Sequence, residues 1–183
     1  MNKKEGNLMY QRGLFIGRFQ PIHLGHIKVI KSLLEEVNEL IIVIGSAQLS
    51  HSFNNPFTAG ERILMIRDSL IENNIDISKI FLIPIIDTND NRIWVSHVIT
   101  TVPKFDIVYT NNPLVFRLFK ESGIEVKNTK MFDRDKYIST LIREKILKDE
   151  NWEIYVPKSV VRIIKEIDGI NRIKDIGYTD LKK

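Results

Sequence analysis

The sequence predicts an α/β protein built on a doubly wound parallel sheet with a helical C-terminal tail. Short apolar runs alternate with amphipathic segments along the chain, which is the pattern of repeated strand–helix–strand units. The runs are almost continuously apolar, as in Leu40 to Ile44, and such strands are expected where helices cover both faces of a parallel sheet. No repeat, low-complexity tract or Pro/Gly-rich linker interrupts the alternation, so a Rossmann-like architecture accounts for the whole pattern.

Each element follows from a local pattern. The strands are expected at the apolar runs Leu14 to Ile16, Leu40 to Ile44, Ile80 to Ile86 and Ile107 to Tyr109, with a weaker candidate at Ile124 to Val126. Helical spacing predicts helices in the four intervals, at Leu24 to Val37, Ala59 to Ile71, Arg92 to Thr101 and Pro113 to Ser122. Two more helices, at about Ser139 to Lys148 and Pro157 to Ile167, form the tail, and Asp168 with Gly169 is expected to end the second.

Two helix starts carry recognisable caps. Thr58 followed by Glu61 three residues later is a capping box, which needs no functional explanation. Asn112 is a candidate N-cap, with Pro113 at the first helical position.

Length and composition favour a single domain. With 183 residues, of which 43% are hydrophobic, the chain can bury one substantial core and is short for two. Residues 1–11 begin with a polar, poorly patterned stretch and are expected to form a disordered N-terminal extension. Residues 12–183 are expected to form the domain.

Charge and cysteine content limit the function classes. The net charge of +4 is compatible with polyanionic ligands but does not choose between nucleotides and nucleic acid. Because the chain has no cysteine, a disulfide framework and a thiolate metal site are excluded. The sequence shows no signal peptide, transmembrane run or lipidation motif, so we expect a cytoplasmic protein with no membrane partner.

The decapeptide from Gly17 to His26 predicts a phosphate-binding site. Its sequence is Gly-Arg-Phe-Gln-Pro-Ile-His-Leu-Gly-His. It joins the end of a strand to the start of a helix, where free N–H groups and the helix dipole favour a bound anion. His23 and His26 can face one ligand, and Gly25 lets the backbone approach a phosphate closely.

Other interpretations of the decapeptide are weaker. Zinc usually needs three or more protein ligands, and the sequence offers neither cysteine nor an HExxH pattern to complete the set. The glycine spacing matches neither GxGxxG nor a Walker A loop, which disfavours hydride chemistry and P-loop NTPase mechanics. Either histidine alone would be interpreted as an ordinary surface or core residue. Because both stand in one motif with Gly17, Arg18 and Gln20, that interpretation is disfavoured.

Three further segments are candidates for the same site. Ile138 to Arg143 places hydroxyls at a helix start and an arginine one turn later; alone this is an N-cap and a basic face, but with the decapeptide it becomes the second half of one phosphate site. Gly45 to His51 follows the second strand, where a parallel sheet places a ligand loop. Asp87 to Trp94 follows the third strand, and Trp94 suits a core position as well as a wall for a planar substrate ring.

Taken together, these segments resemble the nucleotidyltransferase superfamily with an HxGH signature and a C-terminal ISxTxxR-like signature. The resemblance is closer to the archaeal nicotinamide mononucleotide (NMN) adenylyltransferases and extends from Arg12 to Ile176. It includes the runs Ile-Gly-Ser-Ala-Gln-Leu-Ser-His, Asn-Pro-Phe-Thr-Ala-Gly-Glu-Arg, Ile-Trp-Val-Ser-His and Asn-Asn-Pro-Leu-Val. HxGH alone is common to the superfamily, whereas the run from Gly45 to Arg62 together with Ile93-Trp94-Val95 is much narrower.

The resemblance implies transfer of AMP from ATP to NMN, with Mg²⁺, to give NAD and pyrophosphate. It implies no protein-held metal site and no nucleic-acid partner, and it implies a homo-oligomer, commonly a hexamer. By motif match, the catalytic residues are His23, His26, Arg18 and Arg143; the ATP-phosphate residues are Gly17, Phe19, Gln20, Gly25, Ser139 and Thr140; the NMN residues are Asp87, Asn91, Trp94 and Ser46.

Two positions depart from the family pattern. Asn54 stands where some relatives carry a basic residue, and Ile138 stands where a serine usually precedes the hydroxyl pair. Both departures are expected to affect ATP affinity more than the reaction class.

Two other functions remain open. Another HxGH enzyme, such as a pantetheine-phosphate adenylyltransferase or a cytidylyltransferase, would share Arg18 to His26 but gives no reason for the segment from Asp87 to Trp94. A basic nucleic-acid-binding domain ranks behind both, because Lys and Arg are interleaved with acids, as in Lys145 to Glu153.

Overall fold

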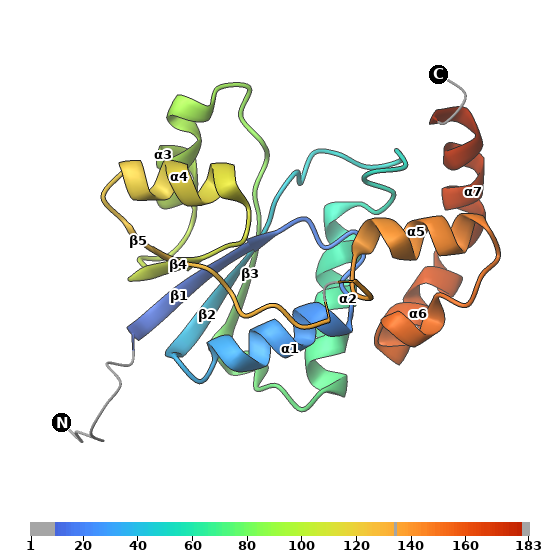
Figure 1. Cartoon of the computed structure of the whole chain (residues 1–183), viewed down its shortest axis with the longest axis horizontal. Coiled ribbons are helices and arrows are strands. Elements are labelled where there is room, and N and C mark those ends of the chain that lie inside the picture. The colour runs from blue at the N-terminus through green and yellow to red at the C-terminus, as the bar shows by residue number, and fades with distance from the viewer. Residues whose placement is uncertain (1–9, 134, 181–183) are drawn as a thin grey trace.

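The computed structural model describes residues 10–133 and 135–180, with side chains up to residue 177. At its centre lies a five-stranded sheet in the order β3-β2-β1-β4-β5, and every neighbouring pair is parallel (Figure 1). The strands are β1 (Tyr10–Gly17), β2 (Val37–Ile44), β3 (Ile80–Pro84), β4 (Ile107–Tyr109) and β5 (Glu125–Lys127). The order reverses between β1 and β4, so the prediction of a doubly wound, Rossmann-like sheet is confirmed.

Helices cover both faces of this sheet. In Figure 1, α1 (Leu24–Leu33) and α2 (Ala59–Glu72) lie on one side, and α3 (Asn91–Thr101) and α4 (Pro113–Glu121) lie on the other. The tail consists of α5 (Ser139–Leu147), α6 (Lys158–Glu166) and α7 (Gly169–Asp180), with short 3-10 turns at Ile77–Lys79 and Glu153–Tyr155. Within the part of the chain that the structure describes, no helix has the length and apolar character needed to cross a bilayer.

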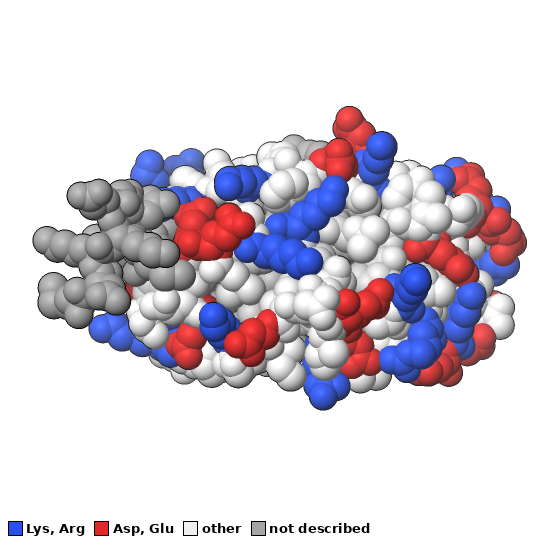
Figure 2. Space-filling model, turned by 90° about the horizontal axis from the view of Figure 1, so that it is seen from below, with Lys and Arg blue, Asp and Glu red and all other residues white. Residues whose placement is uncertain are grey.

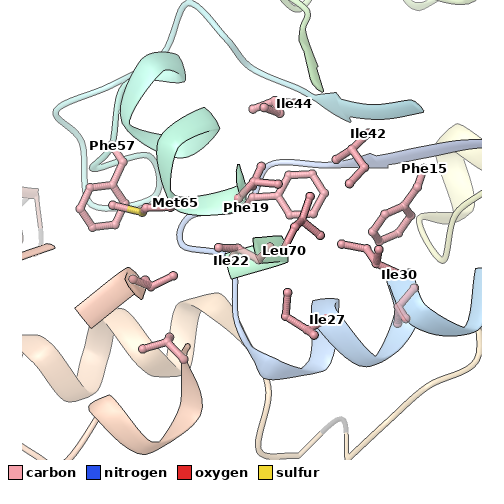
Figure 3. Close-up of a cluster of buried hydrophobic side chains, with 14 of the residues drawn as sticks. Phe15, Phe19, Ile22, Ile27, Ile30, Ile42, Ile44, Phe57, Met65 and Leu70 are labelled. Atoms are coloured by element: carbon pink, nitrogen blue, oxygen red, sulfur yellow. The ribbon is translucent and has the colours of Figure 1, made fainter. Parts of the chain in front are cut away.

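The two cores explain why the central stretches of β1 and β2 are apolar at successive positions. Phe15 and Ile42 point into one cluster with α1, α2 and the tail, whereas Leu14 and Ile41 point into the other cluster with α3 and α4. Figure 3 shows the first cluster, in which the labelled side chains from the strands meet those from α1 and α2. A slip of one residue in a strand would only exchange two faces that are both buried, so burial alone does not specify the pairing register. The register depends mainly on the pairing with the neighbouring strands.

The predicted caps are confirmed. Thr58 accepts a hydrogen bond from the N–H of Glu61, and the Glu61 carboxylate accepts one from the N–H of Thr58. Asn112 caps α4, and Pro113 is its first residue.

The predicted end of α1 is wrong. The helix ends at Leu33, and Val37 is instead the first residue of β2, where it pairs with Tyr10. Val37 fits the helical spacing by chance, because a buried strand residue must also be apolar. Tyr10 and Gln11 belong to β1, so the expected extension cannot reach residue 11; residues 1–9 lie outside the described chain.

Other boundaries also differ from the prediction. β3 stops at Pro84 rather than Ile86, since its partner β2 ends at Ile44. α6 ends at Glu166, with Ile167 as its C-cap, so Asp168 follows the helix end, and Gly169 opens a further helix, α7, that the sequence pattern did not predict. The N-cap of α5 is Ile138, so Ser139 is the first helical residue and not the cap.

The tail packs against the same core as the sheet. α6 packs on α2, α5 packs on α7, and Ile163 and Ile173 belong to the cluster that contains Phe15. Arg172 of α7 forms a two-pronged ion pair with Glu61 of α2, at 2.8 and 2.9 Å. The tail is thereby tied to the helix that follows β2.

Candidate active site

A cavity of about 450 Å³ opens at the carboxyl ends of the strands. Its lining comes from the segments that follow all five strands, and it spans the point between β1 and β4 where the strand order reverses. Doubly wound sheets bind their ligands at this position, because the loops on either side diverge there. Of the predicted site residues, Gly17, Arg18, His23, Gly25, His26, Ser46, Asp87 and Trp94 line the cavity.

His23 and His26 form a reciprocal cap at the start of α1. The N–H of His26 donates to Nδ1 of His23, and the N–H of His23 donates to Nδ1 of His26, both at 3.3 Å. The two rings stack with their centroids 3.6 Å apart. Because each Nδ1 accepts a hydrogen bond, the assigned neutral tautomer carries its proton on Nε2 in both rings.

Both imidazoles are neutral at pH 7. Burial lowers the pKa of His23 to about 4. Burial, together with the neighbouring His23, also holds the pKa of His26 well below its ordinary 6.5. The pair therefore offers Nε2–H donors to an anion without adding charge, while the N-terminal dipole of α1 supplies partial positive charge.

Gly25 is required by close packing. A Cβ at this position would lie 2.7 Å from Cβ of Tyr137 and 3.1 Å from Nδ1 of His23. Tyr137 belongs to the segment between β5 and α5, and its ring lies nearly parallel to that of His23 with centroids 6.2 Å apart. Because position 25 has no side chain, this segment can lie directly against the loop between β1 and α1 (Arg18 to His23), which we call the histidine loop.

Phe19 and Gln20 support the loop from below and do not line the cavity. Phe19 is buried with φ of 51° and packs against Gly17, where a Cβ would lie 2.9 Å from its Cζ. The Gln20 amide pairs with the backbone of Phe57, donating to its carbonyl at 2.9 Å and accepting from its N–H at 3.0 Å. The side chains of Phe19 and Gln20 thus shape the loop, and a phosphate contact of these two residues stays a prediction.

The segment that starts α5 lies against the histidine loop, as the sequence predicts. Ser139 Oγ donates to the carbonyl of Pro21 at 3.0 Å, and Arg143 Nη1 donates to the carbonyl of Gln20 at 2.8 Å. Segments more than a hundred residues apart in the sequence are thereby joined.

Arg143 lies beneath the loop rather than in the cavity lining. It is 1% exposed, and Nη2 donates to Thr140 Oγ1 at 3.1 Å and to Asn54 Oδ1 at 3.4 Å. Nε is buried with no hydrogen-bond partner among the described residues. Burial, and secondarily the charge of Arg18, lowers the pKa of Arg143 to about 10. The departure at Asn54 is thus accommodated by a contact with Arg143 itself.

The second half of the cavity is built from the ends of β2 and β3. The N–H of Ser46, a residue with φ of 51°, donates to Asp87 Oδ1 at 3.2 Å, and the N–H of Asp87 donates to Gln48 Oε1 at 3.0 Å. Trp94 is half-buried in α3 and meets Phe119 edge-on at 5.7 Å. Asn91, the first residue of α3, is exposed and does not line the cavity.

Two residues that line the cavity after β4 and β5 are not among the predicted site residues. Asn111 and Thr129 form a pair, in which Asn111 Nδ2 donates to Thr129 Oγ1 at 2.6 Å and the N–H of Thr129 donates to Asn111 Oδ1 at 3.0 Å. Applying the strand-end rule to all five strands would have found both. Arg62 was also missed, because its position in α2 was explained by helix capping alone.

The described residues do not form a metal cage. No group of three or more His, Asp or Glu side chains among them is placed to hold a metal ion. Asp87 supplies the one carboxylate among the described lining residues. This donor set suits a divalent cation that is held mainly by nucleotide phosphates, as Mg²⁺ commonly is.

Comparison with known sequences identifies the family. The profile of the cytidylyltransferase-like family matches residues 14–145. A nicotinamide-nucleotide adenylyltransferase from Archaeoglobus fulgidus is 56% identical over 172 residues, which cover 92% of this chain and 99% of that protein. A protein of the same name from Saccharolobus solfataricus is 52% identical over 169 residues, which cover 92% of this chain and 98% of that protein.

Solved structures show the same fold. A bifunctional NMN adenylyltransferase/ADP ribose pyrophosphatase from Francisella tularensis, complexed with AMP and a manganese ion, superposes with a TM-score of 0.76 at 24% identity. The match covers 92% of this chain and 52% of that one, so this chain spans about half the length of that bifunctional protein. On the sequence match and the fold together, this chain belongs to the cytidylyltransferase-like family and, within it, to the nicotinamide-nucleotide adenylyltransferases.

Proposed function

We propose that this protein transfers AMP from ATP to NMN, forming NAD and releasing pyrophosphate. One observation carries the proposal. A single cavity contains both the anion site at the start of α1 and a second part that is lined by Ser46, Asp87 and the indole ring of Trp94. A nucleotide polyphosphate suits the first part and a planar, carboxamide-bearing ring suits the second. The names of the archaeal relatives support the same assignment.

The reaction needs no general base. A 5′-phosphate oxygen of NMN attacks the α-phosphorus of ATP, the new P–O bond forms in line, and the bond to pyrophosphate breaks on the opposite side. A phosphate monoester is largely ionised at neutral pH, since its second pKa is about 6. The histidines do not offer a basic nitrogen either, because both Nδ1 atoms accept backbone N–H groups.

Positioning and charge stabilisation therefore account for catalysis. His23 and His26 would donate through Nε2 to the ATP phosphates, with His26 at the α-phosphate, where charge shifts most. The exposed guanidinium of Arg18 would bind phosphate oxygens of the departing pyrophosphate. Arg143 would contribute its charge from beneath the loop, where it also holds the carbonyl of Gln20.

The remaining predicted contacts divide by position. Gly17 and Gly25 line the phosphate half of the cavity, while Ser139 and Thr140 act through Pro21 and Arg143. Trp94 would form the aromatic wall of the nicotinamide pocket, and the Asp87 carboxylate would accept from the carboxamide. Asn91 receives no role in this proposal, since it lies outside the lining.

We further propose Mg²⁺ as the divalent cation that accompanies ATP. When bound, it neutralises charge on the phosphate oxygens. In this chain Arg18 and the N–H donors of α1 would complete the charge balance on the same phosphates. We also propose a cytoplasmic homo-oligomer, commonly hexameric in the family that the sequence resembles, and sedimentation of the purified protein tests its size.

A substrate panel tests the proposed reaction. Purified protein with Mg²⁺ and ATP should form NAD and pyrophosphate from NMN, while phosphopantetheine and glycerol phosphate stay unreacted. A parallel experiment with CTP in place of ATP tests for cytidylyltransferase activity. Product from phosphopantetheine, or from CTP with glycerol phosphate, would replace the proposal with another HxGH activity.

Nucleic-acid binding finds no support on the surface shown. In Figure 2, Lys and Arg side chains are interleaved with Asp and Glu across that face rather than gathered into a stripe. Generic nucleic acid is recognised through clustered basic side chains, so we expect weak binding that salt abolishes. Tight binding of generic DNA without nucleotide turnover would reverse this ranking.

A further inference from the structure

Arg62 is a fully buried arginine in the first turn of α2, and its guanidinium is bonded to backbone carbonyls. Nη1 donates to the carbonyls of Arg18 at 2.9 Å and Gly45 at 2.8 Å, and Nη2 donates to the carbonyl of Ser46 at 3.1 Å. Nε donates to the carbonyl of Thr58 at 3.3 Å. One side chain thus holds four carbonyls from three segments of the chain.

Three of these four carbonyls belong to residues that line the cavity. Arg18 stands in the loop after β1, which leads to the histidine pair, whereas Gly45 and Ser46 stand in the loop after β2. Ser46 in turn holds Asp87 through its N–H. The guanidinium therefore bridges the phosphate half and the mononucleotide half of the cavity from below.

Among the described residues, Arg62 forms no hydrogen bond or ion pair with a carboxylate. Burial lowers its pKa to about 10, and the charge of Asp87 opposes this shift. Its four hydrogen bonds to carbonyls hold the guanidinium in place, and an apolar side chain would leave these carbonyls without donors. The planar fork of arginine can donate to carbonyls of both loops at once, which an apolar residue cannot do.

We propose that Arg62 is a positioning residue for adenylyl transfer, which holds the loop of Arg18 in register with the loop of Ser46. Each loop would bind its own substrate, and the bridge would align the attacking phosphate of NMN with the α-phosphorus of ATP. This inference rests on the proposed function. Arg62 touches neither substrate and acts only through the backbone of the two loops.

Arg62→Met tests the bridge by separating binding from turnover. Each substrate keeps its own loop, so the Kd values of ATP and NMN, measured separately by calorimetry, should change by less than about threefold, while kcat falls by about 100-fold because the two are misaligned. Arg62→Lys keeps the charge but loses the fork, so its kcat should lie between those of the wild type and Arg62→Met.

Arg172→Met is the matched control. Arg172 is half-buried rather than fully buried, but like Arg62 it donates to backbone carbonyls, those of Pro56 and Ile167, and neither lines the cavity. It also forms the ion pair with Glu61, which is not a lining residue either. Its loss should lower the thermal midpoint while leaving kcat unchanged. All variants are assayed at a temperature where circular dichroism shows them fully folded, so that lost stability is not counted as lost turnover.

The outcomes separate this inference from the proposed function. No NAD from the wild type rejects the proposed function itself. A wild type that turns over, combined with a folded Arg62→Met of normal kcat, rejects only the bridge, as does a kcat loss matched by equal losses in both Kd values. Should Arg62→Met fail to fold, a normal kcat in Arg62→Lys rejects the bridge instead.

Discussion

The histidine pair at the start of α1 makes the folded state sensitive to acid. His23 has a pKa of about 4 in the folded protein and 6.5 as an ordinary side chain. The unfolded chain therefore binds a proton in this interval that the folded chain does not. The stabilisation from the neutral ring is complete above pH 6.5 and is lost as the pH falls toward 4, by about 1.4 kcal/mol per pH unit.

His23→Asn should remove this part of the pH dependence. Asparagine is a good N-cap, so the start of α1 is retained while the titrating ring is lost. Urea unfolding between about pH 7.5 and about pH 4.5 should then show a shallower loss of stability than in the wild type. His51→Asn, which changes an exposed histidine, should keep the wild-type slope. An unaltered slope in His23→Asn would mean that the ring is not held neutral.

His26 should matter more for turnover than for binding NMN. Its Nε2–H is proposed to donate to the α-phosphate, whose charge shifts in the transition state, and removing one such donor costs about 10²–10³ in kcat. His26→Ala should therefore lower kcat strongly with little change in the Kd of NMN. His26→Gln, which can still complete the cap, shows whether the loss comes from the helix start. Equal losses in kcat and NMN binding would contradict this role.

Trp94 should act on NMN affinity. Its ring lines the cavity and packs edge-on against Phe119, so Trp94→Phe preserves an aromatic wall whereas Trp94→Ala removes it. The apparent KM for NMN should rise markedly in Trp94→Ala and less in Trp94→Phe, with the KM for ATP unchanged. Steady-state kinetics with one substrate varied at a time measures both. An unchanged KM for NMN would remove Trp94 from the pocket.

Sequence reasoning found the histidine pair and missed Arg62 for a physical reason. His23, Gly25 and His26 are contiguous, so their spacing alone places them at one helix start. The partners of Arg62 are carbonyls of Arg18, Gly45 and Ser46, and backbone carbonyls leave no signature in the sequence. A site made from backbone groups of separate loops becomes visible only in the folded chain.

The packing between α1 and the segment before α5 depends on a missing side chain. Gly25→Ala would place a methyl group 2.7 Å from Cβ of Tyr137, which forces one backbone to move. Overpacking of this kind costs about 1–3 kcal/mol. Displacing the Tyr137 segment should also disturb the histidine loop, so we expect a lower free energy of unfolding together with a lower kcat.

Gly60→Ala is the matched control for Gly25→Ala. Both glycines lie in the first turn of a helix, but a Cβ at Gly60 would meet nothing within 4 Å. A compatible Gly→Ala change stabilises by about 0.4–1 kcal/mol. Denaturant unfolding should therefore move in opposite directions for the two variants. Equal effects would show that Tyr137 does not restrict the space above Gly25.

Elements with strong local signals were predicted, and those decided by tertiary contacts were not. The capping box at Thr58 fixed the start of α2, and the apolar run before Ile44 identified β2. Val37 satisfies both a helical and a strand pattern, and only its pairing with Tyr10 decides between them. α7 was not predicted because a glycine after a helix usually marks the helix end. Here Gly169 instead begins the next helix, where it packs closely on Ile164 and Phe57.

At the scale of the folded molecule, two arginines from distant segments bring positive charge to one loop. Arg143 is buried beneath the carbonyl of Gln20, and the charge of Arg18 contributes to the lowered pKa of Arg143, so the two guanidiniums repel each other in the free protein. α5 brings Arg143 to this place only because the tail packs on the same core as the sheet. The fold as a whole thus maintains a repulsion that a bound polyanion would relieve.

Polyphosphate should therefore stabilise the entire protein against heat. A ligand at about 100 times its Kd raises the free energy of unfolding by about 2.7 kcal/mol, or about 5–10 °C in the thermal midpoint for a chain of this size. At equal concentrations ATP and pyrophosphate should raise the midpoint more than AMP, which lacks the outer phosphates. Differential scanning calorimetry measures all three.

Arg143→Met provides the decisive comparison for this stabilisation. Losing the buried guanidinium removes the repulsion with Arg18, so the free variant should lose less stability than the loss of its hydrogen bonds alone would suggest, while the midpoint increase with pyrophosphate should shrink. High salt should reduce the wild-type increase as well, since part of Arg18 is exposed to screening ions. Equal midpoint increases with AMP and ATP, or an undiminished pyrophosphate effect in Arg143→Met, would show that the phosphates bind away from this pair of arginines.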